Sequence, residues 1–378
     1  DYFMAIDKSE EKIIETLQKR HDPEAERLKR FLAMPDLTRT PESPLADLAN
    51  RIISLPRFLE FKNLVVPEIV GYNISFDLFN FPSDHPARNP SDTYFIDENH
   101  ILRPHTTVMW YYHLNLPEVN NKIKKGEPVG ALSYGKVYRK DEIDRSHMNV
   151  FHQMDGWYLC KKEEKIITSQ DLRNVLIEIA QAVFGVGVQY RFNEDKFPYT
   201  DPSLEMEIEK NGKWIEILGS GVVSGRVLKN LGIDPDVYNG WAFGFGLERL
   251  AIASMELPDI RLLWSDDDRV KKQLRLGNKF KEVSKFPPIT RDISFVVSKD
   301  FVPNNYFDLI RDIGGDLVEE VKLLDKYENS AKFSSNEVSY TYRIIYRSNE
   351  RTLLSSEVDI VQDKIYQETK NQFKAKIR

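Results

Sequence analysis

An arginine and a glutamine lie on two neighbouring strand-like segments. The first segment, Gly135-Lys-Val-Tyr-Arg139, is followed by a loop of mixed charge and then by Phe151-His-Gln153-Met-Asp155. A hairpin of these two strands would put Arg139 and Gln153 on one surface. An arginine on a rigid strand presents a fixed fork of donors, which suits a phosphate oxygen. Taken alone, the pattern favours a surface hairpin with a salt-bridged Arg139.

A glycine-rich segment carries a second arginine. Gly240-Trp-Ala-Phe-Gly244-Phe-Gly246 precedes Leu-Glu-Arg249, where a helix is predicted to begin. Alternating glycines let a ligand lie flat on the backbone, and the first turn of the helix delivers Arg249 to it. A dinucleotide-binding turn does not fit, because Arg249 replaces its third glycine and no βαβ unit surrounds it. The two arginine segments together are more specific than either alone.

Six of the seven histidines lie between His85 and His152, which raises the possibility of a metal site. No pair of them has the close helical spacing of a zinc protease, and the single cysteine, Cys160, has no partner. The sequence therefore favours structural roles for these histidines. A single cysteine also excludes an internal disulfide and indicates a reducing compartment.

Composition sets broad limits on the class of protein. A chain of 378 residues, 41% hydrophobic and 30% charged, can bury one sizeable core and a smaller second one. No apolar stretch approaches the ~18–20 residues that cross a bilayer, so we expect a soluble protein without a membrane partner. The net charge of −6 argues against wholesale polyanion binding but permits a local basic face. The sequence begins with Asp1, and we expect any targeting segment to lie upstream.

The first part of the chain mixes helical and strand patterns. Residues 7–30 predict a solvated helix, and Ser43-Pro44 begins a second helix that Pro56 should interrupt. From about Leu64 to Leu159, short aromatic and β-branched runs predict strands. The remaining predictions are a helix from 168 or 169 to about 185, strands over 204–208 and 214–218, and a helix after 246.

The C-terminal part has a different pattern. Residues 271–288 are polar and Lys-rich and end in Phe-Pro-Pro, which predicts an interdomain linker. Beyond it the order is strand, helix, strand, strand, helix, with residues 375–378 as the sole candidate for a last strand. This is a ferredoxin-like split pattern. From residue 281 onward there are 16 basic and 16 acidic residues, so the segment is neutral.

The two arginine segments resemble motifs 2 and 3 of class II aminoacyl-tRNA synthetases, and the surrounding sequence resembles phenylalanyl-tRNA synthetase. Matching stretches are found from about Leu64 to the end, and Phe286–Phe295 with Arg351-Thr-Leu resembles that family's ferredoxin-like anticodon-binding domain. Fusion of this domain to the catalytic one is the single-chain organellar arrangement. The resemblance implies an α+β fold with an antiparallel-sheet catalytic domain. Its matching stretches are Ser83–Arg88, Leu102–Thr107, Phe151–Gln153, Phe197–Tyr199, Trp214–Gly221 and Leu257–Arg261.

The resemblance also implies a reaction. ATP and Mg²⁺ would convert L-phenylalanine to phenylalanyl-adenylate, and the amino acid would pass to the 2′-hydroxyl of the tRNA for phenylalanine. Positioned arginines and Mg²⁺ suit such a phosphoryl-centred step, which needs no covalent nucleophile. By resemblance the catalytic residues are Arg139, Arg249 and Glu216, and Glu216 is also the Mg²⁺ ligand. The ATP-binding residues are Arg139, Asp141, His147, Phe151, Glu216, Gly246 and Arg249, with Phe151 and Arg249 on the two faces of adenine.

The amino-acid pocket is assigned in the same way. By resemblance His105, Thr107, Gln153 and Asp155 grip the ammonium and carboxylate, and Phe197, Tyr199 and Ala242 enclose the phenyl ring, with Gly219, Gly221 and Gly244 alongside. The pocket departs from the family pattern in four places. Asp155 replaces a common Glu, Thr107 a common Ser, Trp110 a frequent Gln and Tyr199 a common Phe. Discrimination against tyrosine is left open, because an apolar pocket rejects a hydroxylated analogue only weakly.

Further expectations concern organisation and partners. We expect a helical extension (1–63), a catalytic domain (64–270), a linker (271–288) and an anticodon-binding domain (289–378). The protein should be a monomer in the mitochondrial matrix or another organelle. An alternative is a catalytically inactive, synthetase-like tRNA-binding or regulatory protein, which should lack Arg139, Arg249 or Glu216, yet all three are present. Phosphate contacts to tRNA should come from Arg343, Arg347, Arg351 and Lys364.

Overall fold

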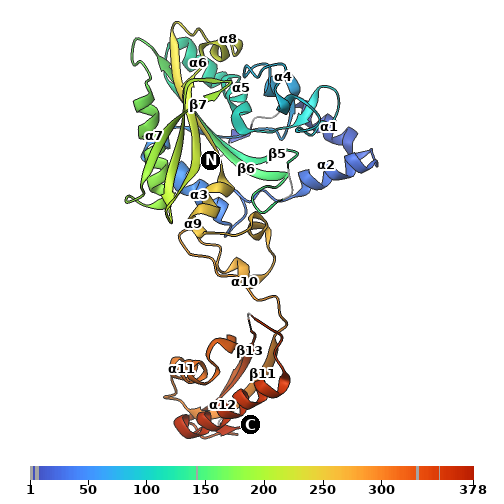
Figure 1. Ribbon diagram of the computed structural model, residues 1–378, viewed down its shortest axis with the longest axis vertical. Coiled ribbons are helices and arrows are strands. Elements are labelled where there is room, and N and C mark those ends of the chain that lie inside the picture. The colour runs from blue at the N-terminus through green and yellow to red at the C-terminus, as the bar shows by residue number, and fades with distance from the viewer. Residues whose placement is uncertain (1–2, 5–7, 142–143, 329–331, 349) are drawn as a thin grey trace. The chain divides into compact units, whose positions relative to one another are not determined.

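The chain folds into two compact units, Asp1–Phe280 and Lys281–Arg378. Both contain helices and strands, so the fold is of the α+β class (Figure 1). The computed structural model describes residues 3–4, 8–141, 144–328, 332–348 and 350–378. No helix within these ranges has the length and apolar character needed to cross a membrane.

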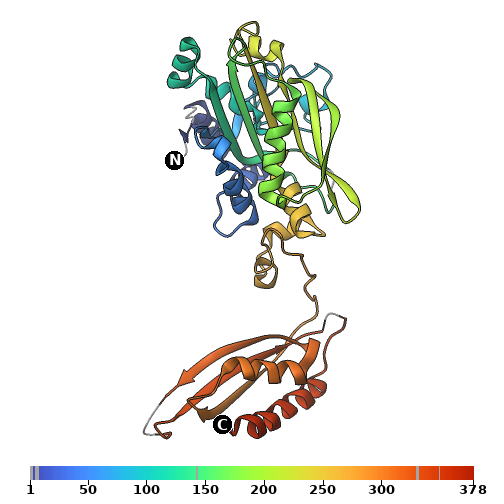
Figure 2. The ribbon, with the colours of Figure 1, turned by 90° about the vertical axis from the view of Figure 1, so that its left-hand side faces the viewer.

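An eight-stranded sheet forms the frame of the first unit (Figures 1 and 2). Its strand order is β1-β2-β5-β6-β10-β9-β8-β7. Strands β1, β2 and β5 run parallel, whereas every pairing from β5 to β7 is antiparallel. The strands are β1 (Phe3–Met4), β2 (Lys62–Val65), β5 (Val129–Tyr138), β6 (Val150–Lys161), β7 (Tyr190–Phe197), β8 (Thr200–Lys210), β9 (Lys213–Val223) and β10 (Tyr238–Gly246). A separate pair is formed by β3 (Ile69–Gly71) and β4 (His100–Leu102).

Two of the longer helices of the first unit pack against the sheet and against each other. Helix α7 lies in front of the strands in Figure 2 and contacts β9, β10 and α9, and α9 contacts β6. The longer helices are α1 (Lys8–Gln18), α2 (Pro23–Ala33), α3 (Pro44–Ile53), α6 (Pro117–Lys125), α7 (Ser169–Phe184) and α9 (Leu247–Met255). The short ones are α4 (Tyr72–Ser75), α5 (Met109–Leu114), α8 (Gly225–Asn230) and α10 (Asp268–Lys271).

Two predicted helices have the caps that their sequences indicate. Ser43 accepts a hydrogen bond from the Leu45 amide at the start of α3. Thr168 and Asp171 form a capping box at the start of α7, which ends at Gly185. The single helix predicted over residues 7–30 is wrong in one respect, because Asp22 caps a new helix that begins at Pro23.

The prediction of strands from Leu64 to Leu159 is also wrong in part, because α4, α5 and α6 lie within this range. Helix α6 carries a proline in its first turn and ends at Gly126, whose φ of 78° is left-handed. Helix α5 has six residues and is stabilised by packing, since Met109 and Trp110 are fully buried. Its aromatic composition favours strands locally, so tertiary contacts override propensity here.

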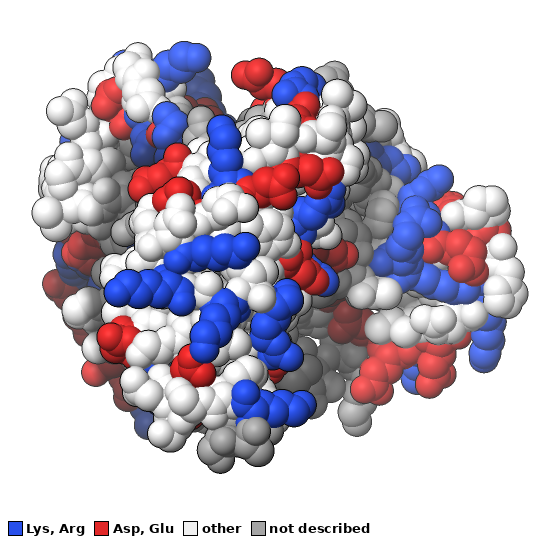
Figure 3. Space-filling view, turned by 90° about the horizontal axis from the view of Figure 1, so that it is seen from below, with Lys and Arg blue, Asp and Glu red and all other residues white. Residues whose placement is uncertain are grey.

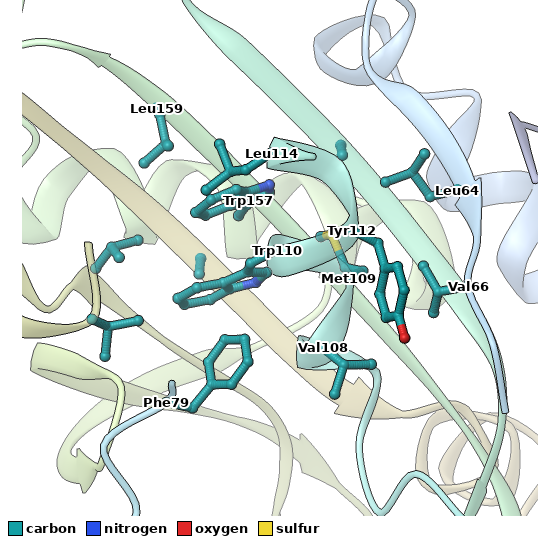
Figure 4. Packing of buried hydrophobic residues seen from close by; sticks show 14 of the residues in the cluster. Leu64, Val66, Phe79, Val108, Met109, Trp110, Tyr112, Leu114, Trp157 and Leu159 are labelled. Carbon is teal, nitrogen blue, oxygen red and sulfur yellow. The ribbon is translucent and has the colours of Figure 1, made fainter. Parts of the chain in front are cut away.

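The hydrophobic core around α5 is rich in aromatic rings. Trp110 stacks on Trp157 of β6, with ring centroids 4.9 Å apart and planes 9° from parallel. Figure 4 shows these two indoles side by side, with Phe79 against the free face of Trp110. Because large rings fix one another's orientation, this core gives the strand β6 a rigid support.

The N-terminal residues belong to the first unit, not to a separate extension as expected for residues 1–63. The Glu10 carboxylate of α1 accepts hydrogen bonds from the amides of Glu68 and Ile69 at 2.9 and 3.1 Å. The Lys136 ammonium of β5 donates to carbonyls at the end of α2, among them Leu32 at 2.9 Å. These bonds tie α1 and α2 to the central part of the fold.

The expected linker of residues 271–288 is also shorter in the structure. The Gly277 amide donates to the Ser254 hydroxyl at 2.8 Å, and the Phe280 amide donates to the Met255 carbonyl at 2.9 Å. Both acceptors belong to α9. The residues up to 280 are therefore packed in the first unit, in agreement with the division at Phe280.

The second unit is a four-stranded antiparallel sheet with two helices. The strand order is β12-β13-β11-β14, which is the ferredoxin-like arrangement predicted from sequence. Helices α11 and α12 pack on one face, where they enclose a core that includes Phe295, Tyr342 and Ile365. The elements are β11 (Ile289–Ser298), α11 (Pro303–Gly314), β12 (Val318–Tyr327), β13 (Glu337–Tyr346), α12 (Ser355–Phe373) and β14 (Lys376–Ile377). The predicted last strand at 375–378 is confirmed.

Candidate active site

Strand alternation on β6 and β10 decides which residues can reach the site. Because successive side chains point to opposite faces, Gln153 and Asp155 share a face with Phe151, whereas His152 points to the other side. Gln153 pairs with Gly246 of β10, and Asp155 pairs with Gly244. A Cβ at Gly244 would lie only 3.1 Å from the Asp155 carboxylate, so glycine leaves the space that this carboxylate needs.

These strands form the floor of a cavity of about 750 Å³. Sixteen of the residues predicted for the site line it together: His105, Thr107, Arg139, Asp141, His147, Phe151, Gln153, Asp155, Phe197, Tyr199, Glu216, Gly219, Ala242, Gly244, Gly246 and Arg249. Gly221 does not line it. A Cβ at Gly221 would lie 2.2 Å from that of Thr200, so this glycine permits close packing of β8 on β9.

Arg139 at the end of β5 is fixed before any ligand arrives. Its Nε donates to the Pro104 carbonyl at 2.8 Å, and its guanidinium carbon lies 5.3 Å from the centre of the Phe151 ring. The two terminal nitrogens make no hydrogen bond within the described part of the chain. Burial lowers the pKa of the guanidinium from its ordinary value. A preorganised and partly desolvated cation of this kind is suited to a phosphate oxygen.

Arg249 and Glu216 lie at a more open end of the cavity. Arg249 stands in the first turn of α9, and its Nη1 is 2.9 Å from Glu216 Oε1 on β9. Both side chains are about half exposed. Glu205 of β8 lies nearby, and its pKa is raised to about 7 by burial, by a hydrogen bond that its protonated carboxyl donates to Asp195, and by the charge of Glu216. This end therefore has a cation with a crowded group of carboxylates beside it.

The carboxylates at this end fit a divalent cation. Mg²⁺ in nucleotide-dependent enzymes is usually held by one or two carboxylates together with substrate phosphates. Glu216 lines the cavity, and its charge adds to burial in raising the pKa of the neighbouring Glu205. No group of three His, Cys, Asp or Glu side chains within the described ranges is arranged to hold a metal on its own.

The opposite end of the cavity has a histidine of defined tautomer. The Ser75 carbonyl, 3.0 Å from His105 Nε2, can only accept, so Nε2 carries the proton and Nδ1 is an acceptor. His105 Nδ1 has no hydrogen-bond partner among the described residues. Burial lowers the pKa of this imidazole to about 3, so the ring stays neutral at pH 7. A neutral acceptor suits an ammonium group, which a charged imidazolium would repel.

Asp155 is held by two threonines at the same end. Thr107 donates its hydroxyl to Asp155 at 3.0 Å, and the Thr106 hydroxyl donates to the other carboxylate oxygen. Burial raises the pKa of Asp155 to about 6, although these hydroxyls oppose the shift. The Thr106 amide lies 3.3 Å from Gln153 Oε1, which turns the Gln153 amino group away from it. The arrangement offers both an anion and a donor to an amino acid.

Aromatic side chains complete this end. Phe197 and Tyr199 are stacked 6.0 Å apart, and Tyr199 meets the edges of Phe79 and Trp110. Trp110 and Ala242 also line the cavity. The walls are therefore apolar and flat, as a benzyl side chain requires.

The remaining histidines do not converge on a metal. His100 and His147 bond to Asp97 and Asp144, three residues before them, at 2.9 and 2.7 Å. His113 accepts a hydrogen bond from the Trp157 indole at 3.0 Å. His100 and His113 therefore have structural contacts, whereas His105 and His147 line the cavity.

Comparisons with known proteins agree with this geometry. Residues 31–274 match the family model described as "tRNA synthetases class II core domain (F)". Residues 284–378 match "Ferredoxin-fold anticodon binding domain". The chain is 39% identical to the chloroplastic/mitochondrial phenylalanine–tRNA ligase of Arabidopsis thaliana, over 85% of this chain and 73% of the relative. It belongs to the phenylalanine–tRNA ligase family.

Other members of the family show a similar match. The mitochondrial phenylalanine–tRNA ligase of Mus musculus is 36% identical over 78% of this chain and 70% of its own. That of Saccharomyces cerevisiae is 32% identical, with 80% of both chains covered. The resemblance to a single-chain organellar phenylalanyl-tRNA synthetase is therefore confirmed, as is the class II fold with its ferredoxin-fold domain.

Several residues of this ligase site were missed in the sequence. Thr106 next to Thr107 and the carbonyls of Ser75 and Pro104 hold predicted site residues, but main-chain acceptors leave no signal in a sequence. Phe79 lies outside the matched motifs, and it supports the wall from behind through its contacts with Trp110 and Tyr199. Each of these residues supports a group that a motif identified.

The four residues predicted to contact tRNA are mostly paired in the structure. Arg343 bonds to Asp292 at 2.7 Å, Arg347 to Glu319 at 2.7 Å and Arg351 to Glu357 at 2.9 Å. Lys364 on α12 is exposed and has no carboxylate within ion-pair distance in the described part of the chain. Figure 3 shows Lys and Arg side chains next to one another on part of the surface, with Asp and Glu close by. Lys364 thus differs from the three arginines in that its ammonium is not already bonded to a carboxylate in the described part of the chain.

Proposed function

We propose that the chain activates L-phenylalanine with ATP and transfers it to the 2′-hydroxyl of the tRNA for phenylalanine. The observation that supports this most strongly is the cavity that holds Arg139 and Arg249 together with an amino-acid pocket. One end has cations and carboxylates for a nucleotide triphosphate. The other end has an acceptor, a carboxylate and flat apolar walls for a phenylalanine zwitterion.

The residue roles at the nucleotide end follow from chemistry and geometry. Arg139 neutralises charge at the α-phosphate where the amino-acid carboxylate attacks, and Phe151 with Arg249 flanks adenine. Mg²⁺, when bound at Glu216, supplies further charge neutralisation on the phosphates. Asp141, His147 and the Gly246 backbone lie along the same wall. None of these residues forms a covalent bond, because positioning and electrostatics supply the catalysis.

The amino-acid end recognises a zwitterion and a ring. His105 Nδ1 and Asp155 accept from the ammonium, while the Gln153 amino group donates to the carboxylate. Phe197, Tyr199 and Ala242 enclose the phenyl ring, and Gly219 leaves room because a Cβ there would lie 3.0 Å from the Phe197 ring. Asp155 is shorter than glutamate by one methylene, so its contact with the ammonium is direct only if the substrate sits deep in the pocket.

The inactive, synthetase-like alternative is not favoured. A protein that had lost catalysis would not need to keep Arg139 without partners for its terminal nitrogens or to keep Glu216 in the cavity, and its family consists of named ligases. Phenylalanine-dependent exchange of pyrophosphate into ATP tests the proposal directly. Exchange followed by charging of the tRNA is expected, and the absence of both from a folded preparation would refute it.

The location in the cell, the part of the chain that binds tRNA and the oligomeric state are proposals of the same kind. The organellar names of the relatives support a place in the mitochondrion or another organelle. The match of residues 284–378 to an anticodon-binding domain supports a tRNA partner held by the second unit. The fusion of both domains supports a monomer, which sedimentation at working concentration would test.

A further inference from the structure

A buried histidine and a buried glutamate connect the two sides of the proposed adenine site. His152 follows Phe151 on β6, and Glu248 precedes Arg249 in the first turn of α9. His152 is 0% exposed and Glu248 is 3% exposed. Strand alternation turns His152 away from the cavity, whereas Glu248 lines it. Their hydrogen bonds join the strand that carries Phe151 to the helix turn that carries Arg249.

Two hydrogen bonds join these residues. The His152 amide donates to Glu248 Oε2 at 2.9 Å, and His152 Nδ1 lies 2.7 Å from Glu248 Oε1. A carboxylate that binds both the main chain and the ring of one residue fixes that residue in two places. The strand end that carries Phe151 and the helix turn that carries Arg249 are thereby held at one spacing.

A third segment defines the state of the ring. The Leu37 amide, which can only donate, lies 3.0 Å from His152 Nε2. Nε2 must therefore be unprotonated, and the proton is on Nδ1, where it is donated to Glu248. Asp36 Oδ1 lies 3.6 Å from Nε2, and Trp264 packs on the ring with centroids 5.7 Å apart. The segment around Leu37 is itself anchored, because Arg39 donates to the Tyr134 carbonyl of β5 at 2.9 Å.

We propose that His152 and Glu248 are positioning residues that hold Phe151 and Arg249 at the spacing required to sandwich adenine, with the Leu37 amide selecting the histidine tautomer. This inference rests on the proposed assignment of Phe151 and Arg249 to ATP. It gives the segment around Leu37, which precedes both arginine motifs in the sequence, a role in nucleotide affinity. Small displacements of a binding group reduce rates strongly, up to about 10²-fold for 1 Å.

The Glu248→Gln substitution tests this geometry. Glutamine has one acceptor and one amino group, so its amino group must face either the His152 amide or Nδ1–H. A tautomer change at His152 would relieve that conflict but would bring Nε2–H against the Leu37 amide. We expect the KM for ATP to rise about tenfold or more, with the KM for phenylalanine within about threefold of wild type.

A second substitution, at His152, should again pair each hydrogen-bond donor with an acceptor between residues 152 and 248. In Glu248→Gln with His152→Asn, the asparagine carbonyl can accept from the glutamine amino group, while the glutamine carbonyl accepts from the main-chain amide. His152→Asn alone keeps a donor toward Glu248 but loses the bond to Leu37 and the packing of the ring on Trp264. We expect the double variant to bind ATP more tightly than Glu248→Gln alone, and such coupling is measured by a double-mutant cycle.

A matched control separates positioning from folding. His152→Phe keeps the ring but removes its hydrogen bonds, and His113→Phe does the same at a buried histidine bonded to Trp157. Both should lower the melting temperature, but only His152→Phe should raise the KM for ATP. Should His152→Phe fail to fold, the Glu248→Gln cycle decides.

The outcomes distinguish this inference from the proposed function. If both KM values rise in parallel, or if the double variant gains nothing over Glu248→Gln, the positioning role is wrong. If wild-type protein shows no pyrophosphate exchange, the proposed function itself fails. If exchange is normal and Arg249→Lys leaves the KM for ATP unchanged, the adenine assignment fails and the inference fails with it.

Discussion

The two units differ in whether the polar side chains assigned to ligand binding already have hydrogen-bond partners. In the first unit, Arg139 bonds to the Pro104 carbonyl through Nε alone, and the buried Nδ1 of His105, which lines the cavity, has no partner in the described residues. In the second unit, Arg343, Arg347 and Arg351 are each bonded to a carboxylate. A site for a small ligand must hold hydrogen-bond donors and acceptors that remain unpaired until the ligand binds. The three arginine pairs have already used theirs, and the exposed pairs of Arg343 and Arg351 contribute little to stability.

The largest expected effect comes from separating the units. A chain ending near Ser284 keeps every residue of the cavity, so it should retain most pyrophosphate exchange, because adenylate formation needs no tRNA. Charging should fall by about 10²–10⁴, since the second unit no longer raises the local concentration of the acceptor end. Exchange and charging are measured on the same preparation, with the full chain as control. Undiminished charging would contradict a tRNA-binding role for residues 281–378.

A smaller loss is expected within the first unit at Arg249. Lysine keeps the charge and can still pair with Glu216, but it removes the planar face, so Arg249→Lys should lose stacking on adenine. Loss of one preorganised contact of this kind costs about 10²–10³ in rate, or about 2.7–4 kcal/mol. Pyrophosphate exchange measures it, and Arg347→Lys in the second unit is the matched control. A rate within threefold of wild type would show that Arg249 has another role.

These two units also differ in how much the sequence predicted. Caps, turns and strand alternation predicted α3, α7, α9 and all elements of the second unit, because the signals are local. Residues 72–125 were mispredicted in part, because α5 depends on burial of Met109 and Trp110. Spacing alone could not find bonds such as Arg343 to Asp292, whose partners are 51 residues apart.

The candidate site shows the same limit. Motifs identified the side chains that face the cavity, but not the groups behind them. His152 was interpreted as structural, since a strand histidine usually is, and only the structure places it between Leu37 and Glu248. Gly221 was assigned to the pocket because of its neighbours in the motif, whereas its contact with Thr200 gives it a packing role. A motif identifies residues that are close in sequence. The residues from distant segments that hold them in place are found only from contacts in the structure.

A pH effect distinguishes the two ends of the cavity. Burial raises the pKa of Asp155 to about 6, so its carboxylate is charged at pH 7 and becomes protonated as the pH falls through 6. At saturating ATP, kcat/KM for phenylalanine should therefore fall about tenfold per unit below pH 6. Asp155→Asn, which cannot ionise, should show low activity without this step. A wild-type profile that stays flat to pH 5 would contradict the ammonium contact.

The same shift affects stability in a defined direction. The folded protein holds the Asp155 proton more tightly than the unfolded chain, whose value is near 3.8. The contribution of this group to stability is therefore largest below pH 4 and declines as the pH rises from about 4 to 6. Asp155→Asn should remove that decline from a plot of melting temperature against pH.

A smaller change is expected at the ring end of the pocket. Ala242→Gly removes one methyl group from the wall and should admit para-substituted phenylalanines, with a loss of backbone order of about 0.5–1 kcal/mol. Activation of para-chlorophenylalanine relative to phenylalanine measures the effect. Gly221→Ala is the contrasting variant, since it should disturb packing on Thr200 without widening the pocket. No gain with the para-substituted substrate would show that Ala242 does not limit the ring.

The smallest expected effect returns to the second unit. Each phosphate contact adds about 0.7–0.9 to the salt dependence of tRNA binding, so four independent contacts would give a decrease near three or more. Because Arg343, Arg347 and Arg351 are paired, we expect replacement of all four basic residues by alanine to lower the slope by only about one unit, chiefly through Lys364. A neutral pair variant, Arg343→Met with Asp292→Asn, should leave the slope unchanged if that pair stays closed on tRNA. A decrease of three or more would show that the arginines leave their carboxylates for phosphates, and an unchanged slope in the quadruple variant would place the basic face elsewhere.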